Sequence, residues 1–138
     1  MHMIARVHNS EGEHHAEVSA GKHAARINIA SRPSGFGSSV SGGELLLLAL
    51  ATCYCNDIYR EAGKLGIHVT AVEVECEADF PAEGAAAQDV KYTARITARA
   101  SDEQIRSLAD KADEMAEIQN TVRGAIPVKL AEVIAETV

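Results

Sequence analysis

The sequence predicts a mixed α+β domain, and three observations indicate this. Several segments alternate apolar and polar residues, which is the pattern of strands with one buried face. Two segments have helical character instead: a strongly apolar run from Glu44 to about Lys64, and an amphipathic one from Ser101 to about Gln119. The length of 138 residues fits one domain, 1–138. The expected order is β-β-β-α-β-β-α-β, with antiparallel sheets.

The expected strands fall into two groups, separated by the apolar helix. Before the helix we expect strands at Met3–His8, Ala16–Ser19 and Ala24–Ala30, separated by turns rich in Gly and Asn. After it, acidic side chains fill one face of 68–80 and basic ones fill one face of 90–100, which suits antiparallel pairing. Residues 126–138 have an ambiguous pattern, strand or helix, and we expect a final strand there.

The apolar helix is the most informative element. Ser41 and Glu44 form an S-x-x-E capping box directly before it, so the helix should begin there. Its first three turns are apolar on every side, which predicts a helix buried all round. One small sheet can cover only one side of it. We therefore expect a homodimer, with this helix near the dimer axis.

Charge and composition exclude several classes of protein. The formal net charge is −7 and no basic cluster occurs, which argues against binding to nucleic acid or to an anionic membrane surface. No apolar run approaches the roughly 18 residues of a membrane span. No apolar leader is apparent at the N-terminus, so we expect a cytoplasmic location. Three cysteines in such a chain suggest free thiols rather than a disulfide framework.

The helix geometry separates the two cysteines that it carries. Cys53 and Cys55 should point about 160° apart, so they cannot act as a pair on one face. Cys76 lies on the apolar face of its strand and could reach either of them. Asp57 shares the face of Cys53, and its carboxylate opposes thiolate formation unless Arg60 neutralises it.

One stretch of the chain resembles a known family. The loop Ser34-Gly35-Phe36-Gly37 is followed by Gly43-Glu44 and a Leu-rich helix to Cys53, and then by Ala62-Gly63-Lys64-Leu65-Gly66-Ile67. This order resembles the OsmC/Ohr family over roughly residues 24 to 128. The resemblance implies antiparallel sheets wrapped around a buried central helix in an intertwined homodimer. It also implies reduction of organic hydroperoxides by a cysteine pair, at sites between the subunits.

The resemblance assigns roles to two residues and leaves two others unmatched. Cys53 matches the family's nucleophilic cysteine, and Glu44 matches the acidic residue at the helix start. The family's second cysteine would fall near residues 118–119, which are Ile and Gln here. The family's N-terminal arginine has no counterpart at residues 8–22, and the sequence does not choose among its substitutes Arg6, Arg26 and Arg32. The chain would therefore be a divergent member.

Two functional hypotheses follow. In the first, Cys53 reduces a small hydroperoxide, a thiol reductant restores it, and Cys76 or Cys55 serves as a secondary or resolving thiol. In the second, the same dimer is a non-catalytic binding protein for a small hydrophobic ligand, with Asn56 and Asp57 as pocket candidates. A third reading is a purely structural descendant, in which Cys55 and Cys76 are small core residues and Glu44 only caps the helix. No cofactor or metal is expected.

Overall fold

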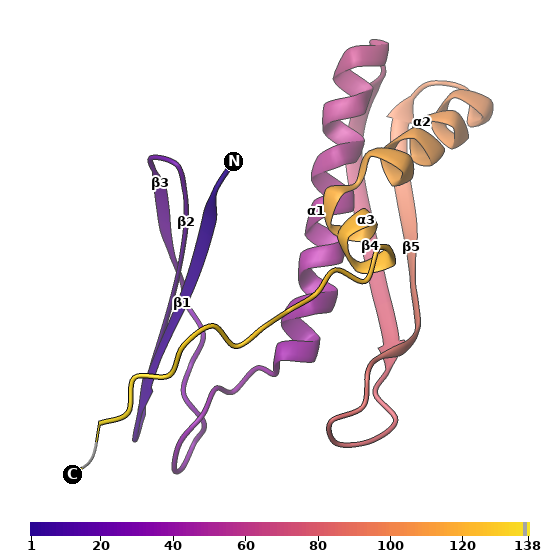
Figure 1. The fold of residues 1–138 in the computed structure, drawn as a ribbon. Coiled ribbons are helices and arrows are strands. Elements are labelled where there is room, and N and C mark those ends of the chain that lie inside the picture. The colour runs from indigo at the N-terminus through magenta and orange to yellow at the C-terminus, as the bar shows by residue number, and fades with distance from the viewer. Residues whose placement is uncertain (137) are drawn as a thin grey trace. The chain divides into compact units, whose positions relative to one another are not determined.

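The computed structural model describes residues 1–136 and 138, and the chain divides into two compact units, 1–46 and 47–138. Figure 1 shows the elements of each unit. Mixed helices and antiparallel strands confirm the predicted α+β class. In chain order they are β1 (Met3–Ser10), β2 (Glu13–Ala20), β3 (His23–Ile27), α1 (Gly42–Leu65), β4 (His68–Asp79), β5 (Gln88–Arg99), α2 (Asp102–Met115) and α3 (Glu117–Arg123).

The first unit contains a three-stranded antiparallel sheet in the order β1-β2-β3. Its register pairs apolar residues across the strands, for example Val7 with Ala16 and Ala16 with Ile27. Because directly paired residues share a face, one face of this sheet is apolar. That face is poorly covered within one chain, since Val7 is 67% exposed. Its members are Ala5, Val7, Ala16, Val18, Ala25 and Ile27.

The Gly-rich loop before α1 is held against the first hairpin by hydrogen bonds. The backbone N–H of Gly37 donates to the Asn9 side chain at 3.0 Å, and the N–H of Arg32 donates to the Gly37 carbonyl at 3.1 Å. Gly37 has a φ of 102°, and a Cβ there would lie 3.1 Å from Nε of Arg32. Glycine at this position therefore permits both the backbone turn and the close approach of the arginine.

Helix α1 begins with the predicted capping box. The N–H of Ser41 donates to Glu44 Oε2 at 2.7 Å, and the N–H of Glu44 donates to Ser41 Oγ at 3.2 Å. The helix ends at Leu65, and Gly66 follows with the left-handed φ of 67° that is common just past a helix end. Among the described residues, no helix is long and apolar enough to cross a membrane.

The second unit buries one face of α1. The long β4–β5 hairpin runs alongside the helix in Figure 1, and α2 and α3 also belong to this unit. The core cluster joins α1 to α2 through Ile58, which is fully buried, and Leu108. Strand residues such as Val72 and Ile96 pack against it from the sheet. The buried α1 residues follow helical spacing: Leu50, Tyr54, Asp57, Ile58, Glu61 and Ala62.

The expectation that α1 is buried on all sides is wrong for a single chain. Leu46 and Leu48 near its start are exposed, and the exposed fraction of Leu48 is 61%. The physical reason is that the second unit offers one hairpin and two short helices, and these cover one face of the helix only.

Two further predictions about the C-terminal part of the chain were also wrong. The helix expected to reach Gln119 breaks at Ala116, whose extended backbone (ψ of 106°) separates α2 from α3. The predicted final strand does not form over residues 126–136, and Thr137 lies outside the described residues. A strand needs a neighbour for its backbone hydrogen bonds, and these residues pair with none of the strands of the described chain.

Candidate functional site

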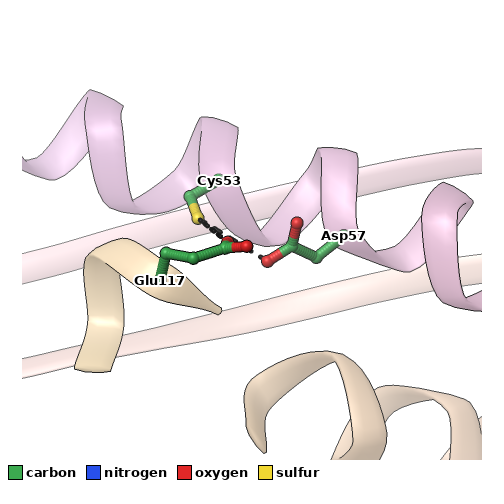
Figure 2. Close-up of side chains that lie close together, drawn as sticks. All are labelled: Cys53, Asp57 and Glu117. Carbon is green, nitrogen blue, oxygen red and sulfur yellow. Dashed lines mark hydrogen bonds between the residues drawn. The ribbon is translucent and has the colours of Figure 1, made fainter. Parts of the chain in front are cut away.

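Cys53 lies where α1 meets the start of α3. Its Sγ is 3.6 Å from Oδ2 of Asp57, one turn along α1, and 3.8 Å from Oε2 of Glu117 (Figure 2). Glu117 is the first residue of α3, so the break at Ala116 is what brings its carboxylate to the thiol. The sequence predicted the nearness of Asp57. It missed Glu117, because a continuous helix was expected through that position.

Arg60 bridges the carboxylates that surround Cys53. Its Nη1 is 2.9 Å from Asp57 Oδ1 and 3.2 Å from Glu117 Oε1, while its Nε is 3.1 Å from Glu61 Oε1. The sequence left neutralisation of Asp57 by Arg60 as a condition, and the structure pairs the two side chains. Since Asp57 and Glu61 are almost wholly buried, the guanidinium offsets charges that would otherwise be costly to bury.

The thiol of Cys53 is held in its protonated form within one chain. Burial raises its pKa above the ordinary cysteine value, the nearby Asp57 and Glu117 raise it further, and a backbone hydrogen bond from Ile118 acts in the opposite direction. Burial also raises the pKa of Asp57, although Arg60 opposes this. A thiolate nucleophile at neutral pH would therefore need a further cation close to the sulfur.

The same three side chains form a set of candidate metal ligands. One ligand atom from each of Cys53, Asp57 and Glu117 lies within 4.8 Å of the others. Thiolate and carboxylate donors of this kind suit a divalent transition metal such as zinc. However, Arg60 already pairs with a carboxylate oxygen of both Asp57 and Glu117. A cation would have to displace that guanidinium, so the geometry favours a neutral thiol beside ion-paired carboxylates over a metal centre.

The other two cysteines face different surroundings. Cys55 lines a small hollow with Asn56 and with Val74 of β4, whereas Cys53 contacts α3. This divergence agrees with the predicted angle between the two side chains. Cys76 lies two residues after Val74 on the same face of β4, and burial raises its pKa. All three cysteines are free thiols. The structure thus places Cys55, rather than Cys53, towards the strand that holds Cys76.

Glu44 lies at a separate cavity in the first unit. This cavity of about 680 Å³ is lined by Arg32 and Glu44, together with several serines of the intervening loop. The capping hydrogen bond from Ser41 lowers the pKa of Glu44, so its carboxylate is ionised at neutral pH. Of the three arginine candidates, only Arg32 lines this cavity. Arg6 pairs with Glu17 on the sheet, and Arg26 lies in a hollow beside that pair.

A second cavity, of about 480 Å³, lies in the second unit and was not expected from the sequence. Tyr54 of α1 and Tyr92 of β5 contribute aromatic rings whose centroids are 4.7 Å apart. Tyr54 donates to the Ala109 carbonyl at 2.8 Å, and burial raises its pKa to about 12. Asn56 and Asp57, the predicted pocket residues, do not line it. Its wall consists of Leu50, Tyr54, Val90, Lys91, Tyr92, Ala109, Asp110, Asp113, Gln119, Val122 and Arg123.

Comparisons with solved structures show the same fold in several bacterial proteins. An OsmC-like protein from Mycoplasma pneumoniae has a TM-score of 0.60 at 16% identity, covering 88% of this chain and 89% of that one. An organic hydroperoxide resistance protein OsmC from Legionella pneumophila has a TM-score of 0.59 at 21% identity, covering 90% of both chains. An OsmC-like hydroperoxide resistance protein from Jannaschia sp. CCS1 has a TM-score of 0.56 at 14% identity, covering 98% and 96%.

No curated protein matches the chain. The family model for OsmC-like protein, in contrast, matches residues 35–131, which include the glycines of the Gly-rich loop from Gly35 onwards, all of α1 and the Cys53 site. This is well over half of the 138 residues. The family suggested by the loop and the helix is thereby confirmed, and the chain belongs to the OsmC-like proteins.

Proposed function

We propose that this protein is a thiol-dependent peroxidase for small organic hydroperoxides, with Cys53 as its nucleophile. The observation that carries the proposal is the position of Cys53. By the sequence resemblance, Cys53 corresponds to the reactive cysteine of the family. It is partly accessible, and it lies among charged side chains at the α1–α3 junction. The hydroperoxide resistance proteins of the same fold support the substrate class.

The proposed reaction has two steps. The Cys53 thiolate attacks the outer peroxide oxygen of ROOH, the O–O bond breaks, and the leaving alkoxide takes a proton to become ROH. The thiol is thereby oxidised to a sulfenic acid. A reductant thiol then attacks the sulfenic sulfur and releases water, and a second thiol breaks the mixed disulfide. Cys53 returns to its reduced form, and the two reductant thiols leave as a disulfide.

The cation that this chemistry needs is supplied, in our proposal, by Arg32 of a second copy. Glu44 and Cys53 are nine residues apart on one continuous helix, which separates them by about 13 Å along the axis. They therefore cannot meet within one chain. If Arg32 and Glu44 of one copy close over Cys53 of the other, the guanidinium lowers the thiol pKa that a single chain holds high.

Uncovered apolar surface supports a homodimer of this kind. The apolar face of the β1–β3 sheet and the first turns of α1 are both exposed in one chain, although each has the composition of a core element. The tail after α3 is also exposed, with Val128 at 95%. A second copy could cover all three regions, and the whole chain, 1–138, would then act as one domain of the dimer.

The remaining thiols have secondary roles in the proposal. Because Gln119 and Ile118 stand where the family's second cysteine would fall, an external thiol is the expected reductant of Cys53. Cys55 and Cys76 are the internal alternatives. Cys55 of α1 lines a hollow with Val74, two residues before Cys76 on β4, which favours a bond between these two thiols over a bond with Cys53. A reducing cytoplasm would keep all three in the thiol form.

The decisive experiment is a peroxidase assay with cumene and tert-butyl hydroperoxides and a dithiol reductant. We expect turnover by the wild type, none by Cys53→Ser, and little change in Cys76→Ser as the matched control. Arg32→Gln should lower the rate and move the pH at which Cys53 is alkylated upwards, whereas Arg26→Gln should do neither. Equal turnover by wild type and Cys53→Ser would end the proposal.

A further inference from the structure

The first hairpin brings two histidines together on its polar face. The strand register pairs His8 of β1 directly with His15 of β2, so the two side chains lie on the same face. Their rings are stacked, with centroids 6.4 Å apart and an angle of 30° between the planes. His14, the neighbour of His15 in the sequence, points to the opposite face, where its ring is hydrogen-bonded to Asn9. The pair therefore follows from the strand register and not from the two adjacent histidines.

A carboxylate lies beside this pair. Glu13 precedes His15 by two residues on β2, so it shares the same face, and its Oε2 is 4.0 Å from His15 Nε2. Within the described chain, no lysine or arginine forms an ion pair with Glu13. The next acidic residue on this face, Glu17, is already paired with Arg6 at 3.3 Å. Glu13 is thus free to contribute an oxygen to a bound cation.

Two imidazoles and one carboxylate form a donor set that suits a transition metal. Imidazole nitrogens favour late first-row ions such as Zn²⁺, whereas Mg²⁺ and Ca²⁺ favour sets of oxygen ligands. With zinc–nitrogen bonds of about 2.1 Å and tetrahedral angles, two imidazoles on one ion have ring centroids about 5 Å apart. The observed separation of 6.4 Å exceeds this by about 1 Å, which rotation of two exposed side chains can close.

The histidine pair lies on the face of the hairpin that the proposed dimer does not use. The adjacent cross-strand pair, Val7 with Ala16, points to the other face, and that is the apolar face which a second copy would cover. Both histidines and Glu13 are exposed. An ion from solution can therefore reach all three side chains.

We propose that His8, His15 and Glu13 bind a late first-row divalent transition ion such as Zn²⁺, with water completing its coordination. The ion would join β1 to β2 across the hairpin. In contrast to the carboxylates beside Cys53, this set contains no guanidinium that a cation must displace. The inference does not rest on the peroxidase proposal, because none of these three residues takes part in that chemistry.

The test is a zinc titration of the full-length protein, followed by NMR of the histidine rings. Zn²⁺ should shift or broaden the ring signals of His8 and His15 in a saturable way. The rings of His23 and His68, which are exposed on other strands, should not respond. Mg²⁺ at the same concentration should move none of these signals, because it favours oxygen ligands.

Four variants locate the ion, with affinity measured by competition against a chromophoric zinc chelator. His8→Gln and His15→Gln each remove a ligand and should weaken binding about tenfold or more, whereas Glu13→Gln should weaken it less. His23→Gln is the matched control and should bind as the wild type does. Zinc should also raise the Tm of the wild type and leave that of His8→Gln unchanged, since only a bound ion stabilises the folded chain.

The Cys53→Ser variant keeps this test apart from the peroxidase proposal. It should bind zinc at the histidine pair as the wild type does, whatever the outcome of the peroxidase assay. Two results would overturn the inference. One is no response of the His8 and His15 rings to submillimolar zinc. The other is zinc binding that is lost in Cys53→Ser, or weakened as much by His23→Gln as by His8→Gln, because the ion would then lie elsewhere.

Discussion

The two halves of helix α1 differ in what covers them. From Leu50 to Ala62 the helix contributes Leu50, Tyr54, Ile58 and Ala62 to the buried core, and Ile58 has no exposed surface at all. From Gly42 to Ala49 the sequence is at least as apolar, yet Leu46 and Leu48 are exposed. The difference lies in the neighbours of each half, since both halves have the composition of a buried helix.

This comparison separates the part of the helix that is buried within one chain from the part that the proposed dimer would cover. The second half of α1 carries Cys53 and closes a core within one chain. The first half carries the Glu44 cap and is the part that a second copy would cover. Substitutions in the second half should therefore act on unfolding, and substitutions in the first half should act on association.

The largest expected effect is on the buried half. Ile58→Ala removes three carbons from a fully buried position between α1 and α2, and it should lower the free energy of unfolding by about 2–5 kcal/mol. Urea unfolding followed by circular dichroism measures this. Tyr59→Ala, at the next and exposed position, serves as the control and should cost less than half as much. Similar losses at both positions would contradict the assigned faces of α1.

The next effect tests the exposed half. Leu48→Asp places a charge where the proposed dimer buries a leucine, and it should weaken dimerisation by about tenfold or more. Sedimentation velocity over a concentration series would show this as a shift from dimer to monomer. His2→Asp, at the exposed N-terminal end, should leave the distribution unchanged. A wild-type protein that is already monomeric at micromolar concentration would remove the dimer from the proposal.

Much of the fold could be predicted from local patterns. Period-two alternation located β3, β4 and β5, turn residues separated β1 from β2, and the S-x-x-E box located the start of α1. Capping and side-chain alternation are set by neighbouring residues, so local patterns can show them. The break at Ala116 had no such signal, since alanine favours helix and the residues around it are helix formers. A buried backbone turn of this kind depends on tertiary packing.

The candidate site was predictable only in part, for a related reason. Asp57 lies one turn from Cys53, and Arg60 lies one turn beyond Asp57, so helix geometry places the three side chains along one face. Glu117 is 64 residues from Cys53 and reaches it only because α3 starts afresh after the break. The cavity around Gln119 likewise combines four elements distant in sequence, and no local pattern could have indicated it.

A smaller effect concerns the helix that covers the buried half of α1. The N-terminal end of α2 is capped by Ser101, whose Oγ accepts from the N–H of Gln104 at 3.2 Å while the Gln104 side chain accepts from the N–H of Ser101. Ser101→Ala should lower the free energy of unfolding by about 1 kcal/mol. Ser107→Ala, at an exposed position within α2, is the matched control and should change stability little or raise it slightly, because alanine favours helix. A loss at Ser107 equal to that at Ser101 would contradict the cap.

The smallest expected effect is electrostatic and lies at Cys53 itself. Glu117 is one of two carboxylates that raise the pKa of this thiol, and Glu117→Gln removes its charge. Removing a nearby negative charge lowers the pKa of the thiol, and a lower pKa gives more thiolate at pH 8. The rate of alkylation at pH 8 should therefore rise by about twofold. Iodoacetamide labelling followed by mass spectrometry of the Cys53 peptide measures this rate.

Glu114→Gln provides the control for that experiment, since Glu114 pairs with Lys111 on α2 and does not touch the thiol. Its rate should equal that of the wild type. The pH profile adds a second readout. In a chain without a cation from a second copy, alkylation of Cys53 should increase only above the ordinary cysteine pKa, because burial raises its pKa. In the proposed dimer, alkylation of Cys53 should begin below the ordinary cysteine pKa. Leu48→Asp should shift the onset of alkylation back to higher pH. If Leu48→Asp leaves the pH dependence of alkylation unchanged, the reactivity of Cys53 does not depend on association through the exposed half of α1.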